Sequence, residues 1–141
     1  MRPILGSLSE PIYALLRIVT GFLFWSHGAQ KLLGMFPGPN GPMHPHGIFV
    51  LAGIIELVCG TLITIGLFAS PAAFLAAGEM AFAYFMGHFP RGFLPIQNMG
   101  ESPVLICFIY LYIAATGSGI LSVDLLVGLG GKARQGAATS S

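Results

Sequence analysis

The chain has 141 residues, of which 55% are hydrophobic and only 8% are charged, and its formal net charge at pH 7 is +1. An ordinary soluble domain carries about 25% charged residues, so the composition excludes a typical water-soluble protein. The small net charge gives no reason to expect nucleic acid as a partner. The length fits a single domain, which we place at residues 1–130, followed by a flexible polar tail at residues 131–141.

Four apolar segments follow one another along the chain, at residues 11–33, 47–68, 71–88 and 103–121. A helix needs about 20 mostly apolar residues to cross the hydrocarbon layer of a membrane. Lipid offers no partner to unpaired backbone groups, so each segment is expected to be helical. The predicted fold is therefore an all-α integral membrane bundle of four antiparallel transmembrane helices.

The connections between these segments are of two kinds. Only Ala69 and Ser70 separate the second and third segments, which must form a tight hairpin. Residues 36–46 are rich in proline and glycine and cannot be helical, and residues 89–102 form a second long loop on the same side. Small residues such as Gly28 and Gly60 predict close contacts between helices.

The positive charges indicate an orientation. Arg2, Lys132 and Arg134 lie on the side opposite the long loops, which offer only Arg91 and the nearby Lys31. Positive residues concentrate on the cytoplasmic side of membrane proteins. We therefore expect a multi-pass protein of the plasma membrane, the inner membrane of a bacterium, with both termini in the cytoplasm.

Three charged residues lie inside the predicted spans: Arg17, Glu56 and Glu79. Each costs about 2.5–3.5 kcal/mol to insert, so each requires a reason. At a rise of about 1.5 Å per residue, Arg17 lies about 9 Å and Glu79 about 12 Å from the same boundary, and the two are expected to pair. Glu56 lies nearer the midplane. The three form either a buried charge network that fixes helix register or a relay for protons or substrate.

The other end of the bundle gathers different polar residues. His27, Gln30 and Lys31 end the first segment and can donate hydrogen bonds to the carbonyl oxygens of a quinone. The cation would also stabilise negative charge during reduction. Phe24 lies just below and offers an aromatic wall for the ring, so these four residues are the predicted quinone site.

A metal centre and an internal electron carrier are not predicted. His44 and His46 flank a proline, but no zinc-type spacing is present. Cys59 and Cys107 are the two cysteines, and they form neither a CxxC nor an iron–sulfur motif. Their estimated depths differ by about 12 Å, too far for a disulfide. Any electrons must therefore come from a partner subunit.

The chain resembles the DoxX family of small four-helix membrane proteins over about residues 11–124. The resemblance rests on the order and spacing of five features, namely residues 26–32 (SHGAQKL), Glu56, residues 88–90 (HFP), residues 98–101 (NMGE) and residues 117–124 (GSGILSVD). The family's namesake is similar to the membrane subunit of a thiosulfate:quinone oxidoreductase.

The resemblance implies a membrane subunit of a quinone-linked oxidoreductase complex, surrounded by lipid and by partner subunits, with a bound quinone. On this interpretation the chain is at most one subunit of an enzyme. The alternative is a non-catalytic subunit that anchors or stabilises a larger membrane complex. A carrier for a small molecule or an ion is a third interpretation.

Overall fold

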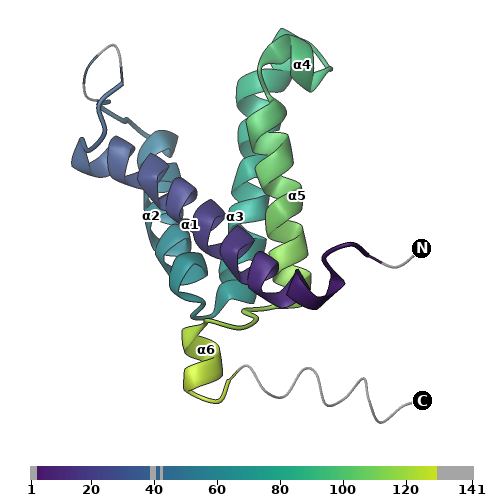
Figure 1. Cartoon of the computed structure of the whole chain (residues 1–141). Helices are drawn as coiled ribbons and strands as arrows, with labels where there is room; N and C mark the ends of the chain where they lie inside the picture. The colour runs from purple at the N-terminus through teal and green to yellow at the C-terminus, as the bar shows by residue number, and fades with distance from the viewer. Residues whose placement is uncertain (1–2, 39–40, 42, 130–141) are drawn as a thin grey trace.

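The computed structural model describes residues 3–38, 41 and 43–129, and within these ranges it contains helices and no strand (Figure 1). The four long helices are α1 (Ser9–Leu33), α2 (Ile48–Ile65), α3 (Ala69–Ala83) and α5 (Glu101–Thr116). The short ones are η1 (Gly6–Leu8), the π-helix η2 (Tyr84–His88), η3 (Phe89–Arg91), α4 (Pro95–Asn98) and α6 (Val123–Leu126). The all-helical prediction is confirmed. The predicted tail at residues 131–141 lies outside the described residues.

Glycines determine where the helices end. Gly34 (φ 64°) ends α1 and Gly66 (φ 71°) ends α2, each in the left-handed conformation that glycine adopts without strain. The predicted end of the fourth helix at residue 121 is wrong. Gly117 (φ 84°) and Gly119 (φ 65°) turn the chain after Thr116, so the residues that follow form a loop.

The four long helices form two pairs that are joined along one seam. α1 packs along α2, α3 packs along α5, and contacts between α2 and α3 join the pairs. Figure 1 shows the pairs close together near α6 and farther apart near α4. We call the end with residues 3–8 and 117–129 the terminal end, and the end with residues 34–38, 43–47 and 84–100 the long-loop end.

The packing differs between the parts of the bundle. α1 approaches α2 so closely that a Cβ atom on Gly28 would lie 2.5 Å from the backbone nitrogen of Leu57. Between α1 and α5, aromatic side chains make the contact instead. The rings of Phe24 and Tyr110 meet edge to face with centroids 5.1 Å apart, and the Tyr110 hydroxyl donates to the carbonyl of Thr20.

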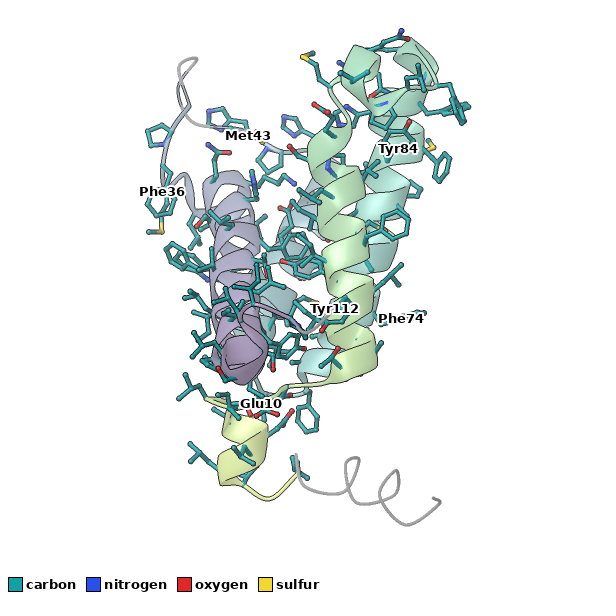
Figure 2. The ribbon with its side chains drawn as sticks, turned by 45° about the vertical axis from the view of Figure 1, so that its right-hand side comes forward. Glu10, Phe36, Met43, Phe74, Tyr84 and Tyr112 are labelled. Atoms are coloured by element: carbon teal, nitrogen blue, oxygen red, sulfur yellow. The ribbon has the colours of Figure 1, made fainter. Side chains whose placement is uncertain are left out.

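Large apolar side chains cover the outside of the bundle. Phe74, Leu105 and Phe108 are each more than 60% exposed, and Figure 2 shows Phe74 pointing away from the helices. Continuous apolar surface of this kind needs lipid or a partner to cover it. Two of the described helical segments, residues 6–33 and α2, are long and apolar enough to cross a membrane, while α5 is apolar but has 16 residues.

Candidate functional site: buried charges at the long-loop end

Arg17 lies at the terminal end, fully buried, and its guanidinium binds backbone carbonyls. Nη1 donates to the carbonyls of Ile63 (2.6 Å) and Thr64 (2.8 Å), and Nη2 donates to that of Leu121 (2.7 Å). The last carbonyls of a helix lack intrahelical partners and carry partial negative charge. Arg17 therefore caps the C-terminus of α2 and ties it to the loop after α5.

The predicted pair between Arg17 and Glu79 is wrong. The salt bridge found in the described part of the chain joins Lys31 to Glu56, and the hydrogen bonds of Arg17 go to carbonyl groups. The physical reason is the loop after Gly117. Because it is not helical, it leaves the carbonyl of Leu121 free at the depth of Arg17, beside those of Ile63 and Thr64 at the end of α2. These carbonyls accept the hydrogen bonds of Nη1 and Nη2, while the buried Nε has no partner among the described residues.

The segment 117–124 closes the terminal end through polar side chains. The Tyr13 hydroxyl donates to the carbonyl of Gly117 (2.5 Å), and Ser118 donates to the carboxylate of Asp124. The other oxygen of Asp124 accepts from the backbone N–H of Phe68 at 3.1 Å, between α2 and α3. This segment therefore connects α1, the α2–α3 corner and the end of α5, and its role is structural.

A second structural network folds the loop at the long-loop end. Asn98 is 2% exposed, and its side chain donates to the carbonyl of Gly92 (2.7 Å) and accepts from the N–H of Gly100 (2.8 Å). Nδ1 of His88 lies 3.0 Å from the carbonyl oxygen of Asn98, and Tyr84 donates to the carbonyl of Phe93. No cluster of three or more potential metal ligands occurs among the described residues.

A third polar group contains the remaining charged residues inside the bundle. Nζ of Lys31 lies 2.5 Å from Oε1 of Glu56, whose residue is 3% exposed. Glu79 lies within electrostatic range of Lys31 and Glu56, and His27 lies within electrostatic range of Glu56. We call His27, Lys31, Glu56 and Glu79 the acid–base cluster. It brings together side chains from α1, α2 and α3.

Two oxygens of the cluster are left without partners. Oε2 of Glu56 and Oε2 of Glu79 are buried and accept no hydrogen bond from the described part of the chain. The Lys31 ammonium neutralises one carboxylate. A charge on the second carboxyl group, which is partly buried, would be costly because its buried oxygen has no donor among the described residues. The cluster can therefore hold a proton and receive a hydrogen-bonding ligand.

The structure separates the four residues of the predicted quinone site. His27 is exposed, and Lys31 is in the cluster. Gln30 instead donates to the carbonyl of Phe36 at 2.7 Å, which holds the following loop. Phe24 is 1% exposed and packs in the core. Of the four, Lys31 binds Glu56 directly and His27 lies within its electrostatic range.

Sequence reasoning missed the pairing of Lys31 with Glu56. The pairing could have been inferred from the helical face on which Lys31 lies. Lys31 follows Phe24 by seven residues and Arg17 by fourteen. Residues at this spacing share one face. Since Arg17 and Phe24 are buried, the same face carries Lys31 toward the interior.

Comparison with known proteins agrees with these motifs. Residues 12–89 match the model of the DoxX family, a range that includes the whole cluster. The chain is 41% identical to an uncharacterized protein of Haemophilus influenzae over 118 residues, 79% of this chain and 87% of that protein.

An uncharacterized membrane protein of Mycobacterium tuberculosis is 31% identical over 107 residues, 67% of this chain and 64% of that protein. No solved structure matches. Since the match to the family model covers more than half of the sequence, the chain belongs to the DoxX family.

Proposed function

We propose that this protein crosses the bacterial inner membrane four times, through α1, α2, α3 with its extension η2, and α5, with both termini in the cytoplasm. The apolar outer surface supports this arrangement, and so does the similarity to the mycobacterial relative, which is named as a membrane protein. The 16 residues of α5 rise about 24 Å, short of the full hydrocarbon thickness. Apolar residues that flank α5 would complete its crossing.

Cysteine labelling tests this topology. In a protein with Cys59 and Cys107 replaced by alanine, a Gln97→Cys variant at the long-loop end is expected to react with a membrane-impermeant maleimide added to intact spheroplasts. A Val127→Cys variant at the terminal end is expected to react only after lysis. The reverse pattern would invert the orientation, and labelling of both variants from outside would show that α5 does not cross the membrane.

The protein works, on our proposal, as a membrane subunit of a quinone-linked oxidoreductase complex. The observation that supports this most is the acid–base cluster, with its two buried carboxylate oxygens that lack hydrogen-bond donors. Reduction of a quinone takes up two protons and builds negative charge on the ring. Carboxyl groups can hold such protons, and the Lys31 ammonium can stabilise the charge. A partner subunit with a redox cofactor supplies the electrons.

Replacement of Lys31 tests the function. Lys31→Met keeps the length of the side chain and removes the cation, so the quinone that co-purifies with the protein is expected to fall. Each 1.4 kcal/mol of lost interaction lowers affinity about tenfold. The measurement is the quinone content of an organic extract per mole of folded protein.

Arg91→Met is the matched control, because Arg91 is an exposed cation at the same end whose hydrogen bonds, among the described residues, go to the carbonyl of Gly87. If Lys31→Met and Arg91→Met retain equal quinone, the cluster does not bind it. If the unchanged protein carries no quinone and co-purifies with a larger complex, the anchoring role is correct. The exposed apolar surface of α5, with Leu105 and Phe108, would suit such a role.

A further inference from the structure

An apolar groove runs along the outside of the seam between α2 and α3. It has a volume of about 420 Å³, within the range of small-molecule sites. The groove is lined by Ile48, Leu51, Ala52 and Ile55 of α2 and by Phe74, Leu75, Gly78, Glu79 and Phe82 of α3. Glu79 is the one residue in this set with a polar side chain.

Glu79 connects this groove to the acid–base cluster. It lines the groove, its Oε2 is buried without a partner, and Glu56 and Lys31 lie within its electrostatic range. On α2, Ile55 lines the groove while the next residue, Glu56, pairs with Lys31. A ligand in the groove would therefore contact Glu79, which interacts electrostatically with the Lys31–Glu56 pair.

We propose that the groove binds an isoprenoid quinone, with the carboxyl of Glu79 as its hydrogen-bonding partner. This inference rests on the proposed function and specifies where the quinone binds. The carboxyl, when protonated, donates to a quinone carbonyl, and when ionised it accepts from a quinol hydroxyl. The ring and the start of the tail contact the apolar walls.

Charge and access favour a quinone over a phospholipid. The groove lining contains one acid and no cation, so it offers nothing to a phosphate, whereas a quinone is neutral. The groove also opens sideways, since Leu51, Phe74 and Leu75 on its walls are each more than half exposed (Figure 2 shows Phe74 pointing outward). A quinone dissolved in lipid can enter without leaving the membrane.

Gly78→Leu is the sharpest test of this site. A Cβ atom at Gly78 would meet no atom within 4 Å, so leucine fills the groove without a clash at Cβ, and it favours the helix over glycine. The probe is decylubiquinone, titrated into the full-length protein in lipid nanodiscs. The dissociation constant is expected to rise at least about tenfold, the equivalent of about 1.4 kcal/mol.

The matched control is Gly87→Leu, because Gly87 also has no atom within 4 Å of its Cβ position and does not line the groove. This variant is expected to bind decylubiquinone as the unchanged protein does. Glu79→Leu should weaken binding, and Glu79→Gln should recover part of it, since an amide N–H can also donate to a carbonyl.

The outcomes separate this inference from the proposed function. If the unchanged protein binds decylubiquinone and neither Gly78→Leu nor Glu79→Leu weakens it, the quinone binds elsewhere and only the groove is wrong. If the unchanged protein binds no quinone, both proposals fail. If native mass spectrometry finds a phospholipid that Gly78→Leu removes and decylubiquinone does not displace, the groove is a lipid site and this inference is overturned.

Discussion

Arg17→Met is expected to lower the free energy of unfolding by at least about 3 kcal/mol. Three carbonyls would lose a charged donor at 2.6–2.8 Å, namely the buried one of Ile63 and the partly buried ones of Thr64 and Leu121. A buried acceptor left without a partner costs about 1–3 kcal/mol. Arg17→Lys should recover only part of the loss, because a single ammonium cannot span carbonyls on two sides as the guanidinium does. Equilibrium unfolding in mixed detergent micelles measures both variants.

A double-mutant cycle of Arg17→Met and Glu79→Gln tests whether Arg17 binds carbonyls alone or forms an ion pair with Glu79. Without a direct contact between Arg17 and Glu79, the two changes should add to within about 0.5 kcal/mol. Glu79→Gln keeps the shape of the side chain and should cost little by itself. If Arg17→Met and Glu79→Gln together cost much less than their sum, the two side chains pair directly, contrary to the structure.

The helices could be predicted from the sequence, because a long apolar segment surrounded by lipid has few alternatives to the α-helix for pairing its backbone groups. Their ends were harder to predict where the hydrophobic pattern continues into a turn. Residues 117–121 contain apolar side chains and were predicted as helix, yet Gly117 and Gly119 adopt positive φ and the helix ends at Thr116. The partners of Arg17 depend on that turn. One misplaced helix end therefore changed the assignment of the most buried charge.

The candidate site could be predicted only in part, because depth along a helix axis does not give the reach of a side chain. Helical side chains point toward the N-terminus of their helix, and lysine has a long flexible stem. Lys31 sits near the end of α1 and extends back to Glu56. The spacing along α1 indicates the face that carries Lys31, but it does not show how deep the ammonium reaches. Gln30 and Phe24 had plausible chemistry for a ligand, but a loop carbonyl and the aromatic core occupy them.

Gly28→Val is expected to disrupt the α1–α2 interface and to affect the acid–base cluster as well. A Cβ atom at Gly28 would lie 2.5 Å from the nitrogen of Leu57 and 2.8 Å from the carbonyl oxygen of Gly53. Both are backbone atoms, so no side chain can move aside and the helices must separate. Overpacking of this kind costs about 1–3 kcal/mol, and occasionally more. Since Lys31 follows Gly28 by one helical turn and Leu57 follows Glu56, the separation should also lengthen the Lys31–Glu56 contact.

Two measurements check this expectation against one control. Equilibrium unfolding in mixed micelles should show a lower free energy of unfolding for Gly28→Val. The quinone bound to the fraction that remains folded should also fall, as is expected for Lys31→Met. The control is Gly87→Ala, at a position where the added methyl meets open space and which lies outside the groove lining. Equal stabilities of Gly28→Val and Gly87→Ala would mean that α1 and α2 do not pack through Gly28. A destabilised Gly28→Val protein with unchanged quinone content would separate the packing of these helices from ligand binding at the cluster.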